Sequence, residues 1–290
     1  MDLGQVVEWI RFSLVKNELV AILKNIKIII QLLLAFTSMQ ICAQDSAYIK
    51  YENISKQLLL KIKSNTINEA EEKELKQIAL GFQNYGQLID ETDHDYNKSL
   101  EYINKAIVLF VALKDTLSEA NNRKFKGYLL GMLSIYAQAK DEIKVALDLY
   151  SLKKFPAGIA VSQFDLSRVY DQENKIDSSI YYCKTSLAYW KSIDRVSRIV
   201  NVQNMLIYLL IKKKGYKSAI LIQKESESLI NNNNLYWLDI IDFYFVSMQL
   251  YKASKETNSA TLYHHLYQIK LNDLTKEGTD FKSYYKIIVN

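Results

Sequence analysis

The chain has 290 residues, of which 49% are hydrophobic and 24% charged, so it can form a substantial core and does not have a disordered composition. It contains only 8 glycines and 1 proline, too few for the turns and close backbone approaches of sheet-rich or nucleotide-binding folds. The formal charge of +5 is modest and spread along the chain, without the continuous basic face that nucleic-acid binding requires. The composition favours long helices joined by short links.

Residues 1–44 differ from the rest of the chain and predict an export signal. Lys24 and Lys27 precede the apolar run Ile28–Phe36, and Ala43 ends a short polar stretch. A positive region, an apolar region of about nine residues and a small residue before the cut are the layout of a secretory signal. We expect residues 1–44 to be a signal peptide that includes an over-extended translation start, and the rest of the chain to be exported, either periplasmic or secreted.

The alternative for this segment is that it is not cleaved and anchors the protein to the membrane. The uncharged run from Ile28 to Gln44 has 17 residues. That is slightly short of the about 20 residues that a helix needs to cross the apolar core of a bilayer. In this alternative, membrane contact is confined to the N-terminal segment.

Residues 45–290 form the second predicted domain, and their apolar residues recur at helical spacing almost without a break. An N-terminal helix is predicted over Tyr48–Ser64, followed by pairs of helices. The predicted pairs are Asn68–Ile89 with Tyr96–Leu113, Leu117–Ala139 with Ile143–Lys154, the two helices within Ala160–Ile193, the two within Ser197–Ile230, and Leu235–Ser254 with Asn258–Leu274. Gly278 then ends the last helix, and Phe281–Val289 is expected to cap the open end.

The stretch Ala160–Ile193 shows the repeating unit most clearly. Apolar residues recur at helical spacing on both sides of the polar turn Gln172–Lys175. Ser167, Ser179 and Ser186 fall where two antiparallel helices would approach most closely. Because one helical hairpin cannot bury both of its apolar faces, each unit needs neighbours of the same kind.

This unit resembles a tetratricopeptide repeat (TPR), a helix-turn-helix of about 34 residues. With Ala160 as the first position, the large and small residues of the TPR pattern correspond to Leu166, Ser167, Tyr170, Ile176, Ser179, Cys183 and Ser186. The terminal proline of the family is replaced by Lys191. Similar residue types recur 33 residues earlier, at Leu133, Ser134, Ala146 and Tyr150. Other steps between small residues are longer, so we expect a drifting period.

The resemblance implies an all-α fold: a right-handed superhelical solenoid of antiparallel helix pairs with a C-terminal capping helix. Uneven repeats of this kind resemble the bacterial sensor and regulator branch of the TPR family. The function implied is a non-catalytic scaffold that binds a protein or peptide partner in the concave groove. The alternative is a sensory or regulatory TPR region whose effector module is missing or separate.

The resemblance also indicates which side chains line that groove. In the family, the first helix of each pair faces the concave side. The corresponding residues are Tyr128, Ile135 and Gln138 in the second pair, Phe164, Arg168, Asp171 and Gln172 in the third, and Asn201, Asn204, Tyr208 and Lys212 in the fourth. Arginine and lysine suit carboxylates, asparagine suits peptide amides, and tyrosine and phenylalanine are amphipathic anchors.

The sequence carries no motif for catalysis or metal binding. It contains no phosphate-binding loop, nucleophile elbow or zinc-binding helix signature. The adjacent His264 and His265 diverge by about 100° on a helix and do not readily share one ion. Cys183 falls at an apolar repeat position, where we expect a buried thiol, and Gly127 with Gly131 predicts a close helix approach. We expect no enzymatic activity, no cofactor, no metal site and no nucleic-acid partner.

Overall fold

A computed structural model describes residues 48–233 and 235–276, and these residues form helices and turns without a strand. The predicted signal peptide (1–44) and the predicted cap (281–289) lie outside the described residues. The chain divides into two compact units, Met1–Ile78 and Ala79–Asn290. Within the described ranges, no helix has both the length and the apolar character needed to cross a membrane.

The first unit contains the predicted N-terminal helix, over residues 48–63, and the start of α2 (Glu69–Thr92). A capping box begins α2: the Glu71 amide donates to the Asn68 side chain at 3.0 Å, and the Asn68 amide donates to the Glu71 carboxylate at 3.2 Å. These bonds satisfy amides that the first turn of a helix leaves unpaired. Hydrogen bonds from Lys61 and Asn68 hold the pKa of the Glu71 carboxyl below its usual value.

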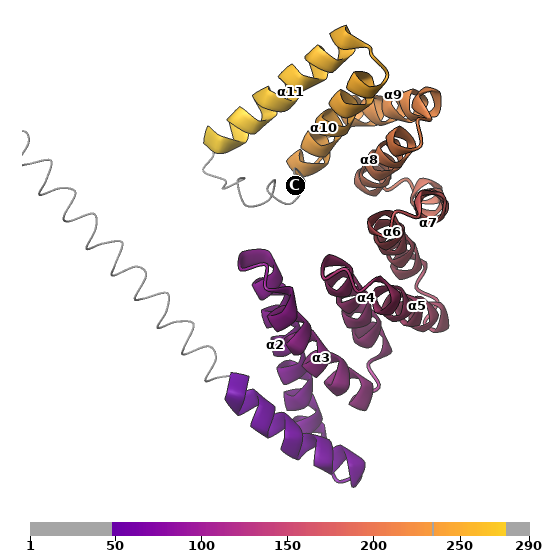
Figure 1. The fold of residues 1–290 in the computed structure, drawn as a ribbon. Coiled ribbons are helices and arrows are strands. Elements are labelled where there is room, and N and C mark those ends of the chain that lie inside the picture. The colour runs from indigo at the N-terminus through magenta and orange to yellow at the C-terminus, as the bar shows by residue number, and fades with distance from the viewer. Residues whose placement is uncertain (1–47, 234, 277–290) are drawn as a thin grey trace, which may run out of the picture. The chain divides into compact units, whose positions relative to one another are not determined.

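The second unit is built from helices of equal length joined by short turns (Figure 1). In the described part of this unit, α3 to α10 have 17 residues each. The helices are α3 (Tyr96–Ala112), α4 (Thr116–Met132), α5 (Tyr136–Leu152), α6 (Pro156–Gln172), α7 (Ile176–Ser192), α8 (Val196–Lys212), α9 (Tyr216–Asn232), α10 (Trp237–Ala253) and α11 (Thr257–Lys276). The sequence predicted most of these helices and their order correctly.

The predicted turn between α4 and α5 was wrong. The sequence analysis extended one helix to Ala139, but α4 ends at Met132 and α5 begins at Tyr136. Ser134, in the turn, adopts the left-handed conformation with φ of 61°. Since apolar residues continue through this turn without a glycine or proline inside it, helical spacing did not reveal it.

The repeat has 40 residues rather than a drifting period that includes 33. The offset of 33 fails because it pairs Ser134, in a turn, with Ser167, inside α6. Left-handed residues that are not glycine recur every 20 residues in this unit, at Lys114, Ser134, Lys154, Asn174, Asp194 and Lys214. Each forms a Schellman motif, in which the next amide donates back to the last helical turn, for example from Lys175 to the Tyr170 carbonyl at 2.8 Å. Two such helices make one repeat.

Helices pack on their neighbours in sequence, so an internal second helix (α5, α7 or α9) lies between two first helices (α4, α6, α8 and α10) (Figure 1). Small residues make this approach possible, as predicted. Ser167 and Ser179 are fully buried, and the Ser179 hydroxyl donates to the Ser167 carbonyl at 2.7 Å. A Cβ atom at Gly127 would lie 2.4 Å from a side-chain carbon of Ile143, which confirms the close approach there. Cys183 is buried, also as predicted.

Candidate partner-binding surface

Three of the predicted groove residues occupy the same position in three successive repeats. Tyr128, Arg168 and Tyr208 are 40 residues apart and lie on the first helices α4, α6 and α8. Arg168 and Tyr208 are exposed and Tyr128 is half-buried. We call these three residues the first-helix row. The 34-residue pattern selected them, but only the 40-residue repeat shows that they are equivalent.

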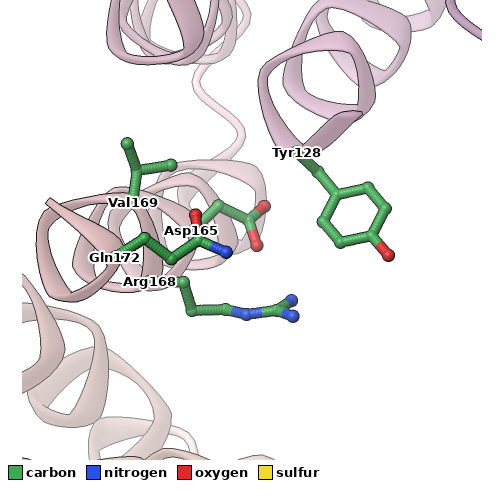
Figure 2. A pocket seen from close by; sticks show the side chains of 5 residues that line it. All are labelled: Tyr128, Asp165, Arg168, Val169 and Gln172. Atoms are coloured by element: carbon green, nitrogen blue, oxygen red, sulfur yellow. The ribbon is translucent and has the colours of Figure 1, made fainter. Parts of the chain in front are cut away.

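The row includes a small pocket between α4 and α6, lined by Tyr128, Asp165, Arg168, Val169 and Gln172. Figure 2 shows Arg168 and Asp165 extending from their helix toward the Tyr128 ring across the pocket. The Arg168 guanidinium carbon lies 5.4 Å from the centre of that ring, within the range of a cation–π contact. This contact orients the guanidinium of an exposed side chain.

Acidic and basic groups alternate around the pocket. Asp165 lies 3.6 Å from the Lys124 ammonium, and both belong to first helices. Between α6 and α8, Lys212 donates to Asp171 at 2.6 Å and lies 5.3 Å from the centre of the Tyr208 ring. Burial lowers the pKa of Lys212, but the hydrogen bond and charge of Asp171 outweigh it and leave that pKa above its usual value. An anion that binds Lys212 must therefore compete with Asp171.

Asp90, near the end of α2, is a charged neighbour that the sequence did not suggest. Burial raises the pKa of its carboxyl, while the nearby His94 and Arg168 and a hydrogen bond from Tyr128 oppose that rise. The Asp90 Oδ1 atom is buried and has no hydrogen-bond partner among the described residues. No local signal marks Asp90, because Tyr128 and Arg168 meet it only through the stacking of first helices.

The structure places several predicted groove residues away from this surface. Gln138 is exposed on α5, a second helix, because the α4–α5 turn precedes it, and Ile135 is the residue that caps α5. Asn204 is 7% exposed, and its side-chain amide donates to the Asp239 carbonyl of α10 at 3.3 Å. Phe164 packs against the core cluster between α6, α7 and α8. These three predicted groove residues were wrong in position.

The remaining predicted residues stay beside the row. Gln172 and Lys212 occupy equivalent positions at the ends of α6 and α8 and are exposed. Asp171 is half-buried beside them, and Asn201 is half-buried on α8. The predicted surface thus reduces to the row and the polar residues at the carboxyl ends of two first helices.

No protein-family model matches the chain, and no curated protein matches it in sequence. Solved structures do match. BtubC (BKLC) from P. vanneervenii is 13% identical with a TM-score of 0.61, over 79% of this chain and 92% of BtubC. Aspartyl phosphate phosphatase F from Bacillus subtilis is 12% identical with a TM-score of 0.61, over 73% of this chain and 56% of the phosphatase.

A third solved structure gives the architecture its name. It is a putative kinesin light chain of Podosopora anserina with nearly identical TPR-like repeats, 10% identical with a TM-score of 0.52, over 70% of this chain and 95% of the other. At these identities the likeness concerns the fold alone. The predicted all-α, TPR-like solenoid of antiparallel helix pairs is thereby confirmed for the described residues.

Proposed function

We propose that this chain is a non-catalytic scaffold that binds a protein or peptide segment along the first-helix row. The observation that carries the proposal is the recurrence of Tyr128, Arg168 and Tyr208 at one position of three consecutive repeats. None of the three belongs to a fully buried core, so the packing of the fold does not require these large side chains. Aromatic and arginine side chains are also the types that contribute most to binding energy in protein interfaces.

The chemistry of the row suggests the kind of segment it binds. Neighbouring helices pack about 8–10 Å apart, which corresponds to about three residues of an extended chain. A segment lying across the row would therefore meet Tyr128, Arg168 and Tyr208 with every third residue. The central Arg168, oriented by Tyr128, suits a carboxylate, and the two tyrosines suit apolar side chains. The favoured partner is an extended segment with one acidic residue between two apolar ones.

A second role was considered because Aspartyl phosphate phosphatase F is among the structural neighbours. That name describes the other protein. Within the described residues, no cluster of three or more His, Cys, Asp or Glu side chains is arranged to hold a metal ion. The pocket beside Arg168 has a guanidinium, an amide and a paired carboxylate, which together suit recognition of a ligand. We therefore favour binding over catalysis.

Selection from a random peptide display library tests the proposal. The wild-type chain should enrich peptides with an acidic residue between apolar residues, and Arg168→Glu should weaken the best peptide by at least about tenfold, since a charge-assisted contact becomes a repulsion. Gln138→Glu is the matched control, because it adds the same charge to an exposed position on α5. Equal affinity of the Arg168→Glu and wild-type chains, with unchanged circular dichroism, would refute the placement of the site.

A further inference from the structure

One face of α11 is open where the same face of every earlier second helix in the unit is closed. Four positions of the repeat define this face: Ala139, Ile143, Ala146 and Tyr150 in α5; Ser179, Cys183, Ser186 and Trp190 in α7; Ala219, Gln223, Ser226 and Ile230 in α9; and Ala260, His264, Tyr267 and Leu271 in α11. In α5, α7 and α9 none of these side chains is more than 8% exposed. In α11, His264 is exposed and the other three are only half-buried. We call these four α11 residues the α11 seat.

The following first helix explains the difference. The face of α7 is covered by α6 and α8, and the Cys183 thiol contacts the Val202 carbonyl of α8 at 3.4 Å. Likewise, α9 contacts both α8 and α10. Among the described helices, α11 packs against α10 alone. The α11 seat is thus the half-built site of one more first helix.

We propose that residues 281–289 of this chain fill the α11 seat. They follow α11 directly, as each first helix of the unit follows the second helix that it covers. Phe281, Tyr284, Tyr285 and Ile288 are spaced i, i+3, i+4 and i+7, the spacing of one apolar helix face. The sequence predicted a cap at this end, and the structure identifies the four residues on which it would rest.

The polar member of the seat also fits this occupant. In α9 the equivalent residue is Gln223, whose side chain is fully buried because tyrosine hydroxyls satisfy it. Gln223 donates to the Tyr263 hydroxyl at 2.7 Å and accepts from the Tyr251 hydroxyl at 3.0 Å. His264 needs the same kind of partner when it is covered, because a buried polar group without a hydrogen bond is unfavourable. Tyr284 and Tyr285 supply two hydroxyl groups for it.

Hydrogen–deuterium exchange of the full-length chain tests the proposal. Tyr285→Glu places a charge on the apolar face of residues 281–289 and should speed exchange of α11 amides by about tenfold or more, as local opening does. Exchange in α5 and α7 should not change. Ser283→Glu is the matched control, because it puts the same charge on the opposite face and should leave α11 as in the wild type.

Two further measurements keep the outcome decisive. His264→Ala alters the seat at an exposed position without affecting the core, so it should also speed α11 exchange, even if Tyr285→Glu is poorly folded. Equal exchange rates in the Tyr285→Glu and Ser283→Glu chains, both folded by circular dichroism, would overturn the proposal. So would a wild-type dimer by light scattering that His264→Glu dissociates and Tyr285→Glu does not, since a second copy would then fill the seat.

Discussion

At the scale of single residues, the identity of small side chains was readable from the sequence, while the neighbours that require them were not. Ser167 and Ser179 were predicted at a helix contact, and both are fully buried there. Gly127 and Gly131 were predicted together because of their spacing, yet they face different helices: Gly127 meets Ile143 of α5, and Gly131 meets Val169 and Gln172 of α6. The two glycines therefore differ in what a larger residue would cost.

Gly127→Ala is expected to destabilise the protein by about 1–3 kcal/mol, the usual cost of overpacking. The added Cβ would lie 2.4 Å from Ile143 Cγ1 and 2.9 Å from the Ala139 carbonyl oxygen, and the backbone oxygen cannot move away cheaply. Thermal and urea unfolding measure the change.

Gly131→Ala is the control on the same helix. Its Cβ would approach the flexible end of Gln172 at 3.0 Å, and alanine gains about 1 kcal/mol of helix propensity over glycine. We expect no loss of stability. A melting temperature lowered equally by both substitutions would contradict the contacts assigned to Gly127.

At the scale of helices, apolar spacing predicted where helices lie, but turn chemistry set the period. The turns use lysine, serine, asparagine or aspartate at the left-handed position, where glycine is the usual choice. Without the glycine signal, the α4–α5 boundary was misplaced and the TPR length of about 34 residues was imposed on a 40-residue repeat. As a result Gln138 was assigned to the wrong helix.

The same turns provide a stability prediction. Lys114 is exposed and has φ of 55°. A side chain in the left-handed region costs about 1–2 kcal/mol, and glycine gives back about 0.5–1 kcal/mol through the entropy of the unfolded chain. Lys114→Gly should therefore stabilise the protein by about 0.5–1 kcal/mol in urea unfolding.

Lys184→Gly, the same change at an exposed site inside α7, should destabilise it by about 1 kcal/mol. Substitutions that shift the midpoint in the same direction would show that the Lys114 backbone is not strained.

At the scale of the whole molecule, the two predicted domains, 1–44 and 45–290, rest on the composition of the first segment. We propose that the chain is exported after cleavage near Ala43 or Gln44, with retention as a membrane anchor as the alternative. Expression with the native N-terminus, fractionation and N-terminal sequencing distinguish them. Export predicts a soluble envelope or medium fraction that begins near Asp45. A membrane fraction that keeps the apolar run would contradict cleavage, and an uncleaved cytoplasmic protein would contradict both.

The sequence by itself determined the all-α class, most helix positions and the need for stacked pairs, because these depend on local apolar spacing and on the inability of one hairpin to bury its own surface. Tertiary structure alone decided which side chains meet. Asn204 became a contact to α10 and Phe164 became part of the core, while Tyr128, Arg168 and Tyr208 lined up on three successive helices. A shift of a few residues in a turn rotates every later side chain about the helix axis by about 100° per residue, so burial and exposure follow the exact register of packed helices.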